Sequence, residues 1–138
     1  CFARLCPATV DQLAAVAAYA TPKSYFEEVV AEYQRRRDVL VTGLRSIPGV
    51  ESPLPKGAFY TMATFPVADI DDFCRWLLEA HAFEGETVMM APGTGFYGTP
   101  GLGRNQARIA YVLEENALRR AVEVLRRGLR DYPGPRSS

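Results

Sequence analysis

The segment that most restricts the possible folds is the glycine-rich stretch 91–103, which holds five of the chain's 11 glycines. Within it, residues 93–98 read GTGFYG and match the dinucleotide-binding pattern G-x-G-x-x-G. Such a turn needs a strand before the glycines and, after them, a helix whose N-terminus meets the pyrophosphate. Residues 87–91 read as a strand, but 107–112 also read as a strand rather than a helix. The segment therefore predicts a long connection between two neighbouring strands, with glycines where φ is positive, and it argues against a nucleotide site.

Hydrophobic periodicity divides the rest of the chain into four helices and one further strand. Capping boxes at 9–12 and 24–27 predict the starts of the first two helices, and Asp69 predicts the start of the third. The expected order is α-α-β-α-β-β-α. It predicts an α+β fold in which helices cover a small antiparallel or mixed sheet of about three to four strands. The expected helices are 9–19, 24–46, 70–80 and 115–132, and the expected strands are 58–65, 87–91 and 107–112.

The composition is that of an ordinary globular protein: of 138 residues, 48% are hydrophobic and 23% are charged. The 16 basic and 16 acidic side chains cancel, which argues against a nucleic-acid partner. The longest apolar stretch, 13–18, is too short to span a bilayer, so no membrane partner is expected. Three cysteines do not make a disulfide framework and indicate a reducing, cytoplasmic location. The lone His81 argues against a metal site of the usual His/Cys kind.

The length indicates one domain. The chain opens on Cys1 with neither an initiator methionine nor a signal peptide, which suggests a piece of a longer protein. We expect a single domain over 1–132, made of a helical lead-in and long helix at 8–46 and a sheet-and-helix core at 53–132. Residues 133–138 are expected to form a flexible tail.

Arg108 carries a functional signal because it interrupts a strand of small and apolar residues directly after the glycine-rich segment. The period of two places it on the same face as Ala110. An arginine on a partly buried strand needs an anion, since an unpaired buried charge is costly. One possible partner is an internal carboxylate such as Asp71 or Glu84. The other is a substrate carboxylate, which the planar guanidinium would grip through two parallel hydrogen bonds. The residues alone leave both alternatives open.

Other polar or reactive side chains favour structural roles. Lys23 and Lys56 are expected to be solvated turn charges, because lysine is rarely buried. Trp76 lies at helical spacing and is expected to fill the core or an interface. Cys74 has no adjacent base to activate it, so an inert thiol is expected. The basic run 35–37 is flanked by acidic residues, which favours a solvated helix face.

Three motifs resemble those of class I/II pyridoxal-phosphate-dependent aminotransferases of the aspartate-aminotransferase type. Residues 55–60 are similar to the family's P-x-G-A-F-Y strand, and 88–96 resemble its V-x-x-x-P-G-x-x-F loop. Residues 107–111 resemble its x-R-[IL]-[SA]-[YF] strand. The motifs occur in family order, and 9–19 and 24–47 resemble the segments that precede them. The resemblance covers nearly the whole chain and is to the C-terminal portion of the family.

The resemblance implies the small C-terminal domain of such an enzyme. It assigns Arg108 to the substrate α-carboxylate, with Gly93, Phe96 and Tyr97 as further substrate-binding residues. It places no catalytic residue here, because the family's Schiff-base lysine and its other cofactor-binding residues lie in the larger domain. The family uses pyridoxal 5'-phosphate, so this cofactor is expected in the full-length protein and none in the present chain alone.

The expected function is therefore transfer of an amino group between an amino acid and a 2-oxo acid, carried out by a full-length enzyme. The expected partners are those substrates, the larger cofactor-binding domain, and a second copy in a homodimer. The present chain alone is expected to be inactive. A free-standing ferredoxin-like module that binds a small effector is the alternative from another functional class. A decarboxylase or lyase on the same scaffold is a third possibility.

Overall fold

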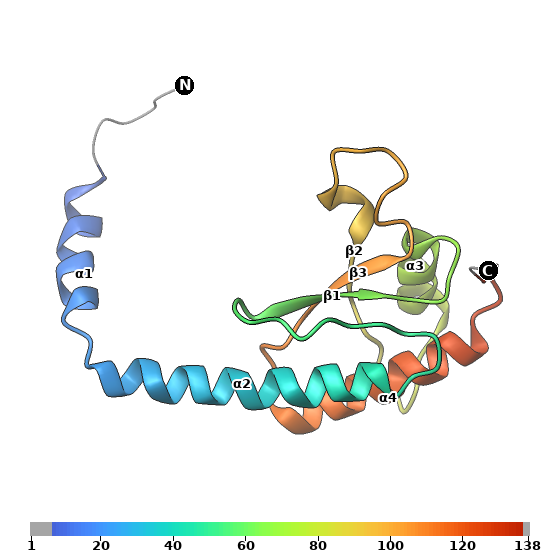
Figure 1. Cartoon of the computed structure of the whole chain (residues 1–138), viewed down its shortest axis with the longest axis horizontal. Coiled ribbons are helices and arrows are strands. Elements are labelled where there is room, and N and C mark those ends of the chain that lie inside the picture. Colours follow the sequence, from blue (N-terminus) through green and yellow to red (C-terminus); the bar gives the residue numbers. More distant parts are fainter. Residues whose placement is uncertain (1–6, 137–138) are drawn as a thin grey trace. The chain divides into compact units, whose positions relative to one another are not determined.

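The computed structural model describes residues 7–136, and the chain divides into two compact units, Cys1–Glu32 and Tyr33–Ser138. The boundary falls inside α2, the helix Lys23–Arg45. The first unit holds α1, Thr9–Tyr19, and the beginning of α2. The second unit holds the sheet and the remaining helices (Figure 1).

The two helices expected at the start of the chain are present, but they are not capped as predicted. Ala8 is the N-cap of α1 and makes no side-chain cap hydrogen bond. Gln12 instead donates through Nε2 to the carbonyl oxygen of Pro7 at 2.9 Å, so it does not close the predicted capping box. Ser24 lies inside α2 rather than before it, because the helix begins at Lys23, directly after Pro22. Proline is well suited to a helix start, since its fixed φ fits a helix and its missing N–H is not needed there.

The second unit is built on a three-stranded antiparallel sheet of order β1-β3-β2, which confirms the expected α+β fold. The central strand β3, Gln106–Ala110, pairs with β1, Tyr60–Thr64, and with β2, Ala91–Pro92. Two further helices complete the unit: α3, Ile70–Ala80, and α4, Glu115–Asp131. Figure 1 shows α4 beside the C-terminal part of α2, on one side of the sheet.

The strands are shorter than their sequence patterns predicted. Ala58 has a φ of 61°, so the backbone leaves the extended region before β1 begins. Pro92 was expected to halt the strand before it, yet it lies within β2. The reason is that β2 is an edge strand, where the N–H that proline lacks need not pair with a further strand.

One face of the sheet is packed against the helices and forms the core. Ala63, Ala107 and Ile109 point into this core together with apolar side chains of α2, α3 and α4. The stripe expected on α4 is confirmed, since all four of its members are buried: Leu118, Val122, Leu125 and Leu129. Side chains cap both later helices: Asp69 accepts hydrogen bonds at the start of α3, as predicted, and Glu114 does so at the start of α4.

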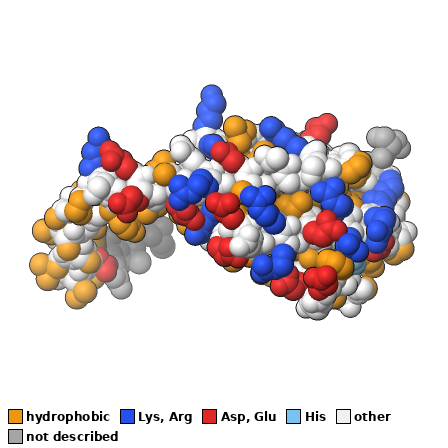
Figure 2. All heavy atoms as spheres, turned by 90° about the horizontal axis from the view of Figure 1, so that it is seen from below, with side chains coloured by type: hydrophobic (Ala, Val, Ile, Leu, Met, Phe, Trp, Pro, Cys, Tyr) orange, Lys and Arg blue, Asp and Glu red, His pale blue; other side chains and the backbone are white. Residues whose placement is uncertain are grey.

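Basic and acidic side chains are interspersed on the face of the molecule drawn in Figure 2. Several form exposed ion pairs, such as Arg126 and Arg127 with Glu123. Pairs of this kind add little stability in water. Among the described residues, no helix has the length and apolar character needed to cross a membrane.

Candidate functional site

The second face of the sheet is left open by the helices. On β3 the side chains alternate, so that Ala107 and Ile109 are buried while Arg108 is partly exposed and Ala110 exposed. Arg108 is paired with Met62 of β1, and residues opposite each other in an antiparallel pair share a face. The structure thus confirms the predicted face for Arg108.

The Arg108 guanidinium lies between two aromatic rings. Its Cζ atom is 4.6 Å from the centroid of the Phe96 ring and 5.2 Å from that of the Tyr60 ring. Among residues 7–136, no hydrogen bond or ion pair to the Arg108 side chain is formed. Asp71 accepts a hydrogen bond from Thr94 Oγ1 at 2.8 Å instead. The pairing of Arg108 with Asp71 or Glu84, which the sequence left open, is therefore not found.

The glycine-rich segment forms a short 3-10 helix, η1, at Gly93–Phe96 and then a loop that returns to β3. Gly93 is buried, and a Cβ at this position would lie 2.6 Å from the backbone oxygen of Gln106. Gly103 has a φ of +75°, and its Cβ would lie 2.7 Å from the backbone oxygen of Gly93. The prediction of a connection between two strands with glycines at positive φ is confirmed at Gly101 and Gly103, whereas Gly93 is required by the lack of space and not by its φ.

Two side-chain hydrogen bonds hold this loop in place. Thr94 Oγ1 donates to Asp71 Oδ2 of α3. Tyr97 Oη donates to Gln106 Oε1 at 2.5 Å, and Gln106 Nε2 donates to Thr64 Oγ1 of β1 at 3.5 Å. The loop that carries Phe96 is therefore tied both to α3 and to the open face of the sheet.

The four predicted substrate-binding residues are Gly93, Phe96, Tyr97 and Arg108, and they do not all lie on the open face of the sheet. Phe96 lies under Arg108 and is 49% exposed. Tyr97 is 39% exposed and points its hydroxyl at Gln106. Gly93 is buried in the crossing of the loop, where it shapes the backbone path.

Sequence reasoning missed Gln106 and Tyr60 as members of this face. The alternation that placed Arg108 on the open face places Gln106 there too, so the signal for it was present. Tyr60 had been treated only as part of a supporting strand. It faces Arg108 through the pairing of β1 with β3, and no local pattern reports that pairing.

Neither lysine of the chain fits the role of a Schiff-base lysine. The side chain of Lys23 is 90% exposed and pairs with Glu27 at 3.4 Å. Lys56 is exposed in the turn before β1. Both settings match the expected solvated charges. Within the part of the chain that the structure describes, no group of three His, Cys, Asp or Glu side chains could hold a metal ion.

The reactive groups near the core do not provide a nucleophile. Burial, and to a lesser extent the charge of Asp71, raises the pKa of the Cys74 thiol to about 11, which confirms it as an inert thiol. Burial also raises the pKa of Tyr111, whose hydroxyl donates to the carbonyl oxygen of Ala58 at 3.1 Å. That hydrogen bond holds the turn that leads into Tyr60.

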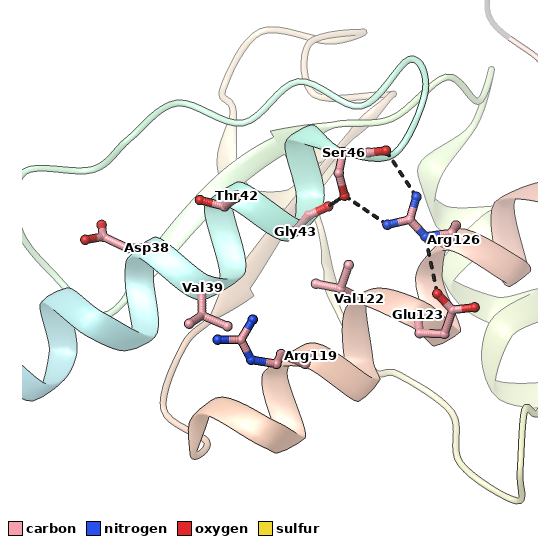
Figure 3. A pocket seen from close by; sticks show the side chains of 9 residues that line it. All are labelled: Asp38, Val39, Thr42, Gly43, Ser46, Arg119, Val122, Glu123 and Arg126. Carbon is pink, nitrogen blue, oxygen red and sulfur yellow. Dashed lines mark hydrogen bonds and ion pairs between the residues drawn. The ribbon is translucent and has the colours of Figure 1, made fainter.

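A groove of about 560 Å³ between α2 and α4 lies away from Arg108 (Figure 3). Arg126 donates to the backbone oxygen of Ser46 at 3.1 Å and to its Oγ at 2.9 Å, and it pairs with Glu123. Arg119 pairs with Glu115 at 3.6 Å. The two arginines of this groove therefore already have partners within the chain, unlike the side chain of Arg108.

Comparison with known proteins gives one consistent result. The family model described as "Aminotransferase class I and II" matches residues 3–125. An aspartate aminotransferase of Rhizobium meliloti (strain 1021) is 34% identical over 131 residues, which cover 86% of this chain and 29% of that protein. An LL-diaminopimelate aminotransferase of Halothermothrix orenii is 33% identical, with 83% and 28% covered.

Solved structures agree with these relatives. The aspartate aminotransferase of Rhizobium meliloti superposes with a TM-score of 0.75 at 31% identity, covering 93% of this chain and 32% of that one. An alanine aminotransferase of Pyrococcus furiosus gives a TM-score of 0.77 at 28% identity, covering 93% and 31%. The chain thus spans about three-tenths of the length of the relatives it matches.

Proposed function

The chain belongs to the class I and II aminotransferase family, and from this premise we propose that it is the C-terminal small domain of a pyridoxal-phosphate-dependent aminotransferase. The complete enzyme transfers an amino group between an amino acid and a 2-oxo acid. In this proposal residues 1–132 pack with a larger cofactor-binding domain in a cytoplasmic homodimer. The family match leaves the free-standing ferredoxin-like module without support.

The observation that carries this proposal is the environment of Arg108. Its guanidinium is partly exposed on the open sheet face and has no carboxylate partner among residues 7–136. A planar guanidinium donates two parallel hydrogen bonds to a carboxylate, which fixes the orientation of the bound molecule as well as its position. Arg108 is therefore proposed to bind the α-carboxylate of the substrate.

The names of the relatives fit this role. Aspartate, alanine and LL-diaminopimelate differ in their side chains, but all three carry an α-carboxylate. A group that binds the α-carboxylate serves each of these substrates equally. The part of the molecule around Arg108 is therefore proposed to supply the common element of recognition, and residues outside this chain to supply side-chain selectivity.

The residues of this chain hold and orient the substrate, and the cofactor supplies the chemistry. Pyridoxal phosphate, when bound, draws electrons from the substrate Cα. Its lysine must come from outside this chain, because Lys23 and Lys56 are both solvated. In this proposal Arg108 fixes the carboxylate and Phe96 forms a wall beside it, while Gly93 and Tyr97 contribute by shaping and holding the loop that carries Phe96. Fixing the substrate in this way converts binding energy into orientation of the bond that breaks.

A hybrid enzyme tests the role of Arg108. The present chain replaces the aligned region of the Rhizobium meliloti aspartate aminotransferase, and transfer from L-aspartate to a 2-oxo acid is measured. We expect Arg108→Lys to lower kcat/KM by about 10- to 100-fold, because lysine keeps the charge but loses the fork geometry. Release of ammonia or CO2 in place of transfer would instead identify a lyase or decarboxylase.

Arg104→Lys is the matched control. Arg104 is also exposed near the same loop, but it already pairs with Asp69 at 3.7 Å. This variant is expected to keep the kinetics of the parent hybrid. Unchanged KM and kcat in Arg108→Lys would refute the carboxylate role.

A further inference from the structure

Arg108 is flanked by rings that come from two separate elements. Tyr60 is the first residue of β1, and Phe96 is the last residue of η1. Both rings are partly exposed, at 38% and 49%. The contact between the cation and these rings therefore lies at the surface of the open face and is not part of the hydrophobic core.

The backbone that carries each ring is anchored. Phe96 lies between two tethered residues, because Thr94 is bonded to Asp71 and Tyr97 to Gln106. Tyr60 is paired with Ala110 in the sheet, and its ring packs edge-on against the Phe59 ring, with the ring centroids 5.5 Å apart and an interplanar angle of 89°. Both rings thus stand on backbone that is fixed by hydrogen bonds.

Fixed rings restrict a side chain that is otherwise free to rotate. An arginine side chain loses much rotamer freedom when it binds a ligand, and this loss weakens binding. A guanidinium held over an aromatic face has lost part of that freedom beforehand. The guanidinium nitrogens of Arg108 nevertheless remain available to a ligand, because no described residue accepts a hydrogen bond from them.

We propose that Tyr60 and Phe96 are positioning residues that hold the Arg108 guanidinium in its carboxylate-binding orientation. They act through Arg108 and do not themselves need to touch the substrate. The effect of the two rings on substrate binding rests on the proposed function, but their effect on the order of the Arg108 guanidinium does not. The two can therefore fail separately.

The first test measures the order of the arginine side chain in the 138-residue chain itself. The order parameter of the Arg108 Nε–H group is measured by ¹⁵N relaxation. We expect about 0.8 in the parent chain and a value below about 0.6 in Phe96→Leu. Phe96→Tyr keeps a ring and is expected to restore the high value. Tyr60→Leu and Tyr60→Phe form a second pair of the same design, in case one leucine variant alters the loop.

A matched control is available in the same chain. The Cζ atom of Arg127, on α4, lies 3.8 Å from the centroid of the Phe83 ring, and neither residue contacts the rings beside Arg108. Phe83→Leu is expected to leave the order parameter of Arg108 unchanged. High order of Arg108 in both leucine variants would overturn the proposal, as would low order in the parent.

The second test uses the hybrid enzyme described above. Removing one ring is expected to raise KM for L-aspartate by about three- to five-fold, with a smaller change in kcat. Phe96→Tyr and Tyr60→Phe are expected to restore KM. If the Arg108 order parameter is high and falls when a ring is removed, but Arg108→Lys leaves the kinetics unchanged, the proposed function is refuted and the positioning role stands. If Arg108 is disordered in the parent chain but Arg108→Lys strongly lowers kcat/KM, the positioning role is refuted and the proposed function stands.

Discussion

Arg108 and Arg127 both lie over aromatic rings, but only Arg127 also has a carboxylate. The guanidinium of Arg127 contacts the Phe83 ring, and its Nε donates to Glu123 Oε1 at 2.8 Å. Arg108 contacts two rings, and no residue among 7–136 neutralises its charge. Both arginines therefore contact aromatic rings. They differ in that a carboxylate of the described chain neutralises the charge of Arg127 but not that of Arg108.

This difference separates a stabilising site from a binding site. Arg127 sits on α4 one turn from its partner, so its ion pair supports the helix surface. Arg108 stands on a strand, beside a loop that is tethered at several points. We propose that this tethered loop and the cation beside it, which has no carboxylate partner among residues 7–136, form a place for an anion from outside the chain.

The largest expected effect comes from breaking the loop at the Arg108 site. Gly93→Ala places a methyl group 2.6 Å from the backbone oxygen of Gln106, and backbone cannot move aside as a side chain does. We expect this variant to lose about 1–3 kcal/mol of unfolding free energy in urea denaturation, and Arg108 to become mobile as Phe96 shifts.

Gly95→Ala is the matched control in the same loop, since a Cβ there has no neighbour within 4 Å. It is expected to change the unfolding free energy by no more than about 0.5 kcal/mol. Equal losses in the two variants would contradict the account of Gly93.

A smaller effect compares the two arginines directly. Glu123→Gln removes the carboxylate that Arg127 shares with Arg126 and is expected to cost about 0.5–1 kcal/mol, a loss that shrinks in high salt. Arg108→Leu breaks no ion pair with a described residue and is expected to change the unfolding free energy by about 0.5 kcal/mol or less. A larger and salt-sensitive loss in Arg108→Leu would show that its charge is neutralised within the chain.

The effect that is smallest at neutral pH concerns Cys74, whose pKa is raised by burial and by the Asp71 carboxylate that anchors the loop. The folded pKa of about 11 lies above the ordinary value of 9.0 for a cysteine thiol. A raised pKa means that the contribution to stability is complete below the unfolded pKa and is lost as pH rises through the folded one. The unfolding free energy is therefore expected to decline from about pH 9 to about pH 11, and less so in Cys74→Ala.

The measurement uses Cys1→Ser and Cys6→Ser as a common background, so that Cys74 is the thiol observed. Alkylation by iodoacetamide under native conditions at about pH 8 is expected to be slow, because the protonated thiol is a poor nucleophile. Rapid alkylation of Cys74 in the folded protein would contradict the raised pKa.

The sequence predicted well those features that depend on local periodicity. The period of two gave the face of Arg108, and the stripe of α4 gave its buried side. Asp69 was recognised as a cap because its side chain bonds to amides only two and three residues away. The glycine-rich segment was correctly separated from a nucleotide loop because the helix that such a loop requires does not follow it.

Features that depend on contacts between distant segments could not be predicted. The capping box at Thr9 failed for a local reason, because the helix already begins at Thr9 and its N-cap is Ala8. Asp71, which the sequence offered as a partner for Arg108, accepts a hydrogen bond from Thr94, 23 positions away. The place of Tyr60 beside Arg108 follows from the register of β1 on β3. A single sequence contains no local signal for such pairings.

The most direct test of the central claim is a crystal structure of the hybrid enzyme with a bound amino-acid substrate analogue. The account predicts that two nitrogens of Arg108 lie about 2.7–2.9 Å from the two oxygens of the α-carboxylate, with Tyr60 and Phe96 still on either side of the guanidinium. An α-carboxylate held by other residues, with Arg108 making no contact to it, would contradict the account.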